Sequence, residues 1–105
     1  MSTITENRRD LIERIRQLEP QLRARGVQRL AVFGSFARDT HRADSDVDLL
    51  VEFVSGQKTF DNFLAVCELL EAQLQRRVEL LTPESLSPHI GPHILREAED
   101  VVAAN

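Results

Sequence analysis

The sequence predicts a small α/β domain in which helices pack against a short β-sheet. The chain has 105 residues, of which 42% are hydrophobic, enough to form one core. Three segments carry apolar residues at helical spacing, and the three short apolar runs between them have the length of buried strands. The resulting order of helix, strand, strand, helix, strand and helix predicts helices packed on a sheet. We expect one domain, residues 1–105.

The first helix is expected within residues 5–25. Pro20 lies inside the pattern and should kink the helix or restart it at a new first turn. Gly26 is expected just past its end. The apolar stripe consists of Leu11, Ile12, Ile15, Leu18 and Leu22.

Three strands follow from short apolar runs that end at turn-forming residues. Gly34 ends the first run, and a polar connection over 34–45 leads to the second. A turn at 54–58 contains Gly56. The expected strands are 27–33, 47–53 and 77–81.

A long second helix is expected over 60–74, with Thr59 as its N-cap. Cys67 lies on its apolar stripe, which favours a small buried hydrophobe over a reactive thiol. Leu64, Leu70 and Leu74 lie on faces that are either core or interface, and the sequence leaves both open. A last helix is predicted from Pro88 to about Val102, from the spacing of Ile90, Ile94, Leu95, Ala98 and Val101.

Charge and composition exclude several classes of protein. The net charge is −4, and residues 1–38 hold eight of the 13 basic residues and four of the 17 acidic ones. An acidic chain without Trp or Tyr is not expected to bind nucleic acid directly. No apolar run approaches the roughly 20 residues of a membrane span. The single cysteine and the polar first ten residues favour a reducing cytoplasm.

Two carboxylates at the start of the second strand predict a metal site. Asp46 and Asp48 are two residues apart, so their side chains leave the same face of the strand. Like charges held together are costly unless a cation lies between them. Hard oxygen ligands favour Mg²⁺ over soft metals.

The end of the first strand has the features of a phosphate site. Gly34 and Ser35 offer free backbone N–H groups and a hydroxyl. Arg38 lies one helical turn further on and supplies a cation.

Together these residues form the pattern G-S-x(10)-D-x-D between two strands, and here the sequence resembles the DNA polymerase beta nucleotidyltransferase superfamily. More narrowly, it is similar to the minimal nucleotidyltransferases (MNT). The resemblance implies a mixed sheet, ATP as substrate with Mg²⁺, and an antitoxin that places AMP on a tyrosine of a HEPN-type ribonuclease toxin. The residues that carry the narrower likeness are 34–38, 44–53, 78–83 and 94–98.

The resemblance also implies roles for individual residues. Gly34 and Ser35 would hold the triphosphate, Asp46 and Asp48 the metal, and Glu79 would be the third carboxylate. Two positions depart from the family. The third carboxylate is more often Asp, and a misplacement on the order of 1 Å can reduce a rate about a hundredfold.

The second departure is Asp39, at a position where Gly commonly follows Arg38. We expect it to make this loop stiffer and more negative.

Three functions remain open from the sequence. The first is a Mg²⁺-dependent transferase in which an acceptor hydroxyl attacks the α-phosphorus of ATP and pyrophosphate leaves. The second is a non-catalytic antitoxin that binds and masks the toxin. The third is AMP transfer to a small molecule, which is disfavoured because such enzymes of the superfamily generally carry an additional domain.

The three histidines are weaker candidates. His89 and His93 are four residues apart on the expected last helix, a spacing compatible with zinc, but no suitable third ligand stands near them. His41 lies in the connection between the two halves of the motif. A solvated loop histidine is favoured there over a phosphate contact.

Overall fold

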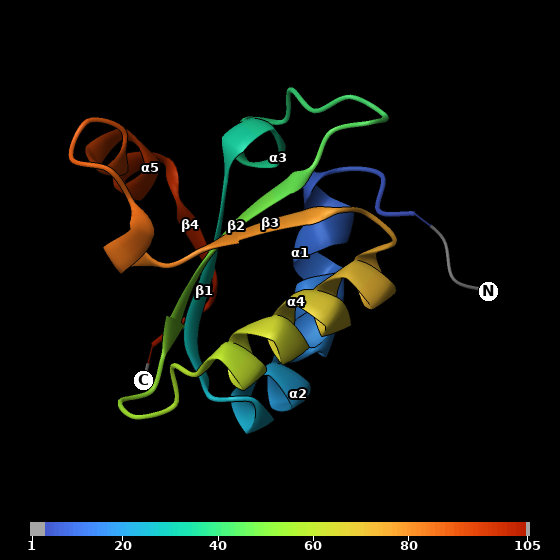
Figure 1. The fold of residues 1–105 in the computed structure, drawn as a ribbon. Helices are drawn as coiled ribbons and strands as arrows, with labels where there is room; N and C mark the ends of the chain where they lie inside the picture. The colour runs from blue at the N-terminus through green and yellow to red at the C-terminus, as the bar shows by residue number, and fades with distance from the viewer. Residues whose placement is uncertain (1–3, 105) are drawn as a thin grey trace.

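The computed structural model describes residues 4–104 and folds them around a four-stranded mixed sheet (Figure 1). The strand order is β3-β2-β1-β4. Strand β1 is antiparallel to both β2 and β4, whereas β2 and β3 are parallel. The expected α/β class is confirmed. The strands are β1 Val27–Phe33, β2 Val47–Phe53, β3 Val78–Leu81 and β4 Glu99–Val102.

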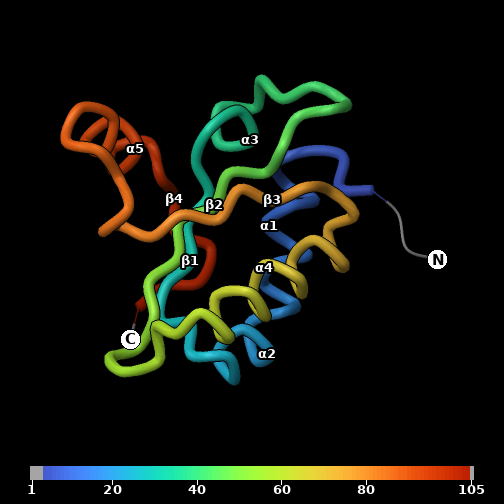
Figure 2. Tube along the Cα trace, in the orientation of Figure 1, coloured from blue at the N-terminus to red at the C-terminus, as the bar shows by residue number. Residues whose placement is uncertain are grey.

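Three helices cover one face of the sheet, and the remaining short ones lie at its top and on its other side (Figures 1 and 2). Within residues 4–104, no helix is both long and apolar enough to cross a bilayer. The covering helices are α1 Arg8–Gln17, α2 Glu19–Ala24 and α4 Phe60–Leu74. The others are α3 Gly34–Arg38, the 3₁₀ turn η1 Pro83–Ser85 and α5 Gly91–Glu97.

Alternation along the strands separates two apolar layers. In β1, Leu30 and Val32 join the main core beneath α1, α2 and α4, while Ala31 and Phe33 face the opposite side. The smaller cluster on that opposite side includes Leu50 of β2. Because Asp48 is two residues before Leu50, its side chain leaves the sheet on the same face as the smaller cluster.

The first helical segment breaks at Leu18, and the restart predicted at Pro20 is confirmed, since Pro20 lies in the first turn of α2. The Asn7 side chain caps α1 by accepting the N–H of Asp10 at 2.8 Å. Gly26 follows the end of α2 with φ +88°, a conformation that favours glycine.

Helix α4 begins and ends where the sequence predicts. Thr59 accepts the Asn62 N–H at 3.1 Å and so acts as the N-cap. Leu70 and Leu74 are fully buried, but the side chain of Phe60 is 77% exposed and that of Leu64 is 43% exposed. Phe63 packs against the core, so of the apolar stripe Phe60 and Leu64 are the residues that face solvent.

The helix predicted over 88–102 is confirmed for Gly91–Glu97, but its last part is wrong. Helix α5 ends at Glu97, Ala98 is extended, and β4 pairs with the free edge of β1. The apolar residues of so short a run fit both helical and strand spacing. The open edge of β1 favours the strand, because its unpaired backbone groups gain hydrogen-bond partners there. Arg29 reinforces the pairing by donating to Asp100 at 2.7 Å. The third strand also begins one residue later than predicted, at Val78.

Candidate active site

Two carboxylates meet across the parallel pair of β2 and β3. Asp48 is the register partner of Glu79, and the two side chains are hydrogen-bonded. The expected neighbourhood of the second and third strands is thus confirmed, and it brings Glu79 to the Asp pair. Asp46 lies on the same face at the beginning of β2 and is exposed.

This crowding changes the acidity of Asp48. Burial, then the hydrogen bond to Glu79 and the charges of Glu79 and Asp46, raise its pKa to about 7, while the charge of Arg38 opposes the shift. A carboxyl that holds its proton at neutral pH is the expected response to several like charges in one place. The site therefore gathers more negative charge than its own side chains neutralise.

The backbone of Gly34 lies directly against Asp48. Gly34 has φ +74°, and a Cβ built on it would lie 2.1 Å from Oδ2 of Asp48. Because Phe33 is the register partner of Asp48 on β1, the turn into α3 must pass over the carboxylate. Only glycine both adopts this positive φ readily and leaves room for the Asp48 carboxylate.

Helix α3 presents Ser35 in its first turn and Arg38 at its end. The N–H of Gly34 donates to Oε2 of Glu97 at 3.1 Å, and the Arg38 guanidinium donates to Oε1 of the same side chain. Asp39 follows in the left-handed region with φ +59°. Glycine adopts that conformation most readily, so Asp39 adds both backbone strain and negative charge.

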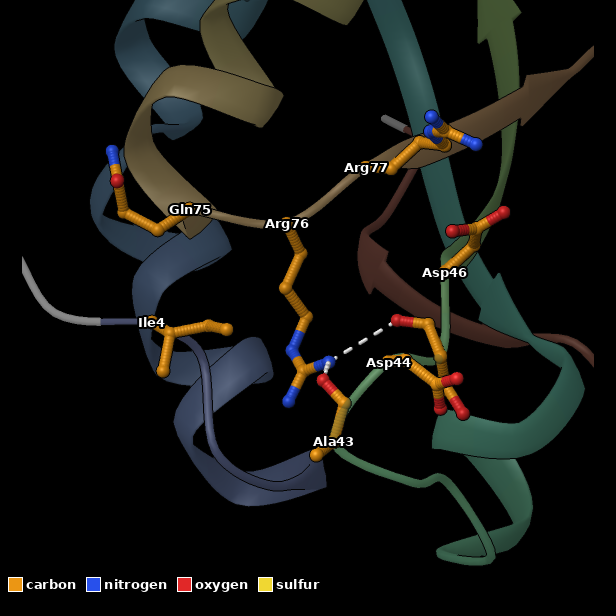
Figure 3. A pocket seen from close by; sticks show the side chains of 8 residues that line it. Ile4, Ala43, Asp44, Asp46, Gln75, Arg76 and Arg77 are labelled. Carbon is orange, nitrogen blue, oxygen red and sulfur yellow. Dashed lines mark hydrogen bonds between the residues drawn. The ribbon is translucent and has the colours of Figure 1, made fainter.

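Arg76 anchors the loop that leads to Asp46. Its Nη1 donates to the carbonyls of Ala43 at 2.9 Å and Ser45 at 3.1 Å (Figure 3). Its Nε donates to the carbonyl of Thr5 at 2.6 Å. The guanidinium carbon lies 5.0 Å from the centroid of the Phe36 ring, within range for a cation–π contact.

A cavity of about 280 Å³ opens beside this anchor and reaches Asp46 (Figure 3). It has both signs of charge on its walls, supplied by two aspartates and two arginines. The cavity is lined by Ile4, Ala43, Asp44, Ser45, Asp46, Gln75, Arg76 and Arg77.

The donor set suits Mg²⁺ supplied together with a nucleotide. In the part of the chain that the structure describes, no three His, Cys, Asp or Glu side chains form a ready metal cage. Mg²⁺ is usually bound by one or two carboxylates, waters and substrate phosphates. Asp48, whose pKa burial and the neighbouring carboxylates raise to about 7, and the exposed Asp46 fit that mode of binding.

The other candidates lie apart from this chemistry. His89 precedes α5 and His93 lies within it, so they do not share one helix face, and both are exposed. The interpretation of His41 as a solvated residue is wrong. Its ring stacks on Phe36 with centroids 4.0 Å apart, and its Nε2 is 2.6 Å from the carbonyl oxygen of Glu6.

Cys67 is partly buried. Burial, and then the charges of Glu71 and Glu68, raise the pKa of its thiol. A raised thiol pKa disfavours the reactive thiolate, in keeping with a packing role.

Sequence reasoning missed Glu97 and Arg76. Glu97 lies in the segment 94–98 that carries the family likeness but has no role there, and its contact with Gly34 spans 63 residues. Arg76 follows a helix end and bonds mainly to backbone carbonyls, which have no sequence signature. A basic residue directly after a helix end was the only available signal for it.

Comparison with known proteins gives a consistent result. The family model described as "Nucleotidyltransferase domain" matches residues 8–101. A Methanocaldococcus jannaschii protein provisionally named a protein adenylyltransferase is 40% identical over 87 residues, covering 83% of this chain and 92% of the relative. The protein adenylyltransferase MntA of Thermococcus cleftensis is 36% identical over 96 residues, covering 91% and 86%.

Solved structures agree in fold. A structure provisionally described as a minimal nucleotidyltransferase superimposes with a TM-score of 0.78 at 34% identity, covering 90% of this chain and 95% of that one. A complex of a tri-AMPylated Shewanella oneidensis HEPN toxin with an MNT antitoxin matches with a TM-score of 0.61 at 16% identity, covering 89% and 73%. At that identity the second likeness concerns the fold alone.

Replacing Gly34 by Ala should destabilise the protein strongly. The new Cβ would meet Oδ2 of Asp48 at 2.1 Å and sit at φ +74°, and we expect a loss of about 3 kcal/mol in the free energy of unfolding. The matched control is Gly56→Ala, at φ +83° with no atom within 4 Å, which should lose about 1 kcal/mol. Urea denaturation measures both, and equal losses would contradict the close approach.

Asp48→Asn should stabilise the metal-free protein at alkaline pH. With a pKa of about 7 against the ordinary 3.8, folded Asp48 binds more proton than unfolded Asp48 between these values. The unfolding free energy of the wild type therefore falls as pH rises through that window. After allowance for solvent screening, the variant should gain about 1 kcal/mol at pH 8 and nothing at pH 4.

Thermal unfolding in a chelating buffer at both pH values tests this. Asp61→Asn, an exposed position on α4, is the control and should keep the wild-type pH dependence. A variant at Asp48 that is less stable than the wild type at pH 8 contradicts the assigned crowding.

Proposed function

Because the chain belongs to the nucleotidyltransferase domain family, we propose that it is a Mg²⁺-dependent protein adenylyltransferase. In this proposal it is an antitoxin that transfers AMP from ATP to a tyrosine hydroxyl of a HEPN-type toxin. The observation that carries the proposal is the contact of the Gly34 turn with Asp48, which is itself bonded to Glu79. A phosphate-binding turn and hard-oxygen ligands then share one edge of the sheet.

In this proposal the site residues have two roles, phosphate binding and metal binding. The Gly34 N–H, the Ser35 hydroxyl and the Arg38 guanidinium hold phosphate oxygens, because they are hydrogen-bond donors at the turn between β1 and α3. Asp46 and Asp48 hold Mg²⁺, and Glu79 completes the set. When bound, the metal neutralises charge on the phosphates.

The reaction is a substitution at the α-phosphorus of ATP. The acceptor oxygen forms a bond to that phosphorus, and the bond from the phosphorus to the bridging oxygen breaks, so that pyrophosphate leaves. The hydroxyl proton passes to a carboxylate oxygen, and the pairing of Glu79 with Asp48 across β2 and β3 supports Glu79 as its acceptor. Glu79 alternatively orients the acceptor hydroxyl.

A protein acceptor fits the size of the fold. Residues 4–104 form one sheet with its helices and no second lobe, so the acceptor is presented from outside this domain. The solved complex named for a tri-AMPylated HEPN toxin and an MNT antitoxin supports a toxin in that role. The names of the relatives support a protein as the target.

Masking without chemistry is the second candidate. One observation favours it: a carboxylate of the chain itself, Glu97, lies on the donors of Gly34 and Arg38. A site filled in this way could be vestigial, and the protein would then silence the toxin by covering it.

Intact-mass spectrometry of the cognate toxin separates the two candidates. Incubated with this protein, ATP and Mg²⁺, the toxin should gain one or more AMP units. The double variant Asp46→Asn/Asp48→Asn should give none, because it lacks the charges that hold the metal. The double variant Asp61→Asn/Glu68→Gln removes two exposed charges from α4, on the other face of the sheet, and should transfer normally.

A silenced toxin without added mass, in a stable complex with both double variants, contradicts the transferase and supports masking. Near-normal transfer by the Asp46/Asp48 variant contradicts the metal assignment alone.

Removal of the metal is a separate test. Transfer should stop when EDTA is in excess over Mg²⁺ and resume when Mg²⁺ is restored, because no protein carboxylate replaces the cation on the phosphates. Circular dichroism before and after chelation should be unchanged. Transfer that persists in EDTA would show that the carboxylates act without a metal.

A further inference from the structure

Glu97 lies where a phosphate group would be expected. Its Oε2 accepts the N–H of Gly34 at 3.1 Å, and its Oε1 accepts from the guanidinium of Arg38. One carboxylate thus accepts hydrogen bonds from two of the three donors that, in the proposed function, bind the phosphates of the nucleotide. The side chain is 25% exposed and comes from the last residue of α5, 63 positions further along the chain.

The carboxylate and a phosphate compete for the same donors. A backbone N–H has a single hydrogen, so the Gly34 N–H has no equal bond left for a phosphate oxygen while Glu97 holds it. Arg38 has several donors, but its charge is shared while Glu97 is paired with it. A polyphosphate that entered while Glu97 is in place would also approach the carboxylates of Asp46 and Asp48. All of these groups are negative, so they repel it.

We propose that Glu97 is an internal stand-in for the phosphates that sets the nucleotide affinity of this site. The proposal rests on the proposed function, since it assumes that ATP binds at Gly34 and Arg38. In the free protein Glu97 fills the position, and ATP binds after the side chain has swung away. The apparent dissociation constant then equals the intrinsic one divided by the fraction of time for which the position is free.

The position of Glu97 makes this exchange feasible. Helix α5 ends at Glu97, and Ala98 is already extended, so a change of side-chain rotamer frees the donors and leaves the paired strand β4 in place. The pair with Arg38 is more than half exposed on the arginine side, at 57%. An ion pair so open to water contributes little to stability and exchanges easily.

A purely supportive role makes the opposite prediction. If Glu97 served to hold Gly34 and Arg38 in the geometry that ATP needs, removing its charge would weaken nucleotide binding. If it competes with the phosphates, removing its charge strengthens binding. The sign of the change therefore decides between the two roles.

Calorimetric titration of the full chain with AMP-PNP and Mg²⁺ measures that sign. Glu97→Gln keeps the size of the side chain and removes its charge, and Glu97→Ala removes the side chain beyond Cβ. Both should lower the dissociation constant about threefold to tenfold. The control is Glu99→Gln on β4, which removes one charge nearby that is paired with Arg8 instead, and it should stay within about twofold of the wild type.

An NMR readout follows the donors themselves. Without nucleotide, the Gly34 amide resonance should shift in both Glu97 variants and keep its position in Glu99→Gln, because Glu97→Ala removes the acceptor of this N–H and Glu97→Gln replaces a charged acceptor by a neutral one. Unfolding curves establish that each variant is folded. Should Glu97→Ala be unfolded, the isosteric Glu97→Gln alone decides.

The failures are distinguishable. Wild type that binds AMP-PNP, together with Glu97 variants that bind equally or more weakly, overturns the role of Glu97 and leaves the proposed function standing. No binding by the wild type or by either variant overturns the nucleotide site itself, and the role of Glu97 with it.

Discussion

The parallel register of β2 and β3 is the constraint on which the candidate site depends. It sets Glu79 beside Asp48, while the antiparallel pairing with β1 sets the turn at Gly34 over the same carboxylate. A one-residue slip in either pairing would send the carboxylate to the opposite face, into the apolar core. The alternation of apolar and acidic residues along β2 therefore fixes the fold and the site together.

That arrangement is unfavourable by itself, and the rest of the molecule stabilises it. Burial and the neighbouring carboxylates raise the pKa of Asp48 to about 7, so the charged form of this side chain is disfavoured there. The opposite face carries the main core, where side chains such as Leu30, Leu49 and Leu70 are fully buried. Burial of these apolar side chains stabilises the sheet and keeps it rigid. The site can therefore retain an arrangement that its own interactions do not favour.

Local patterns predicted the parts of the site that are close in sequence. Gly34, Asp48 and the strands that carry them follow from turn chemistry and short apolar runs. Even Glu79 could be placed by strand alternation once its strand was assigned. The helix predicted over 88–102 failed in its last part because the free edge of β1, which converts its end into β4, is a tertiary feature. Glu97 was missed and His41 misjudged for the same reason, since the groups to which they hydrogen-bond, Gly34 and Glu6, lie 63 and 35 residues away.

On the proposed function, the two carboxylate contacts would couple the binding of metal and of nucleotide. A divalent cation held by Asp46 and Asp48 would lower the negative potential that a triphosphate meets. A triphosphate at Gly34 and Arg38 displaces Glu97 and brings its own oxygens to the cation. Each ligand removes part of the barrier to the other, and by linkage the benefit must be mutual. On the proposed function, Glu97 keeps the phosphate position closed in the protein without nucleotide, and the two ligands open the site together.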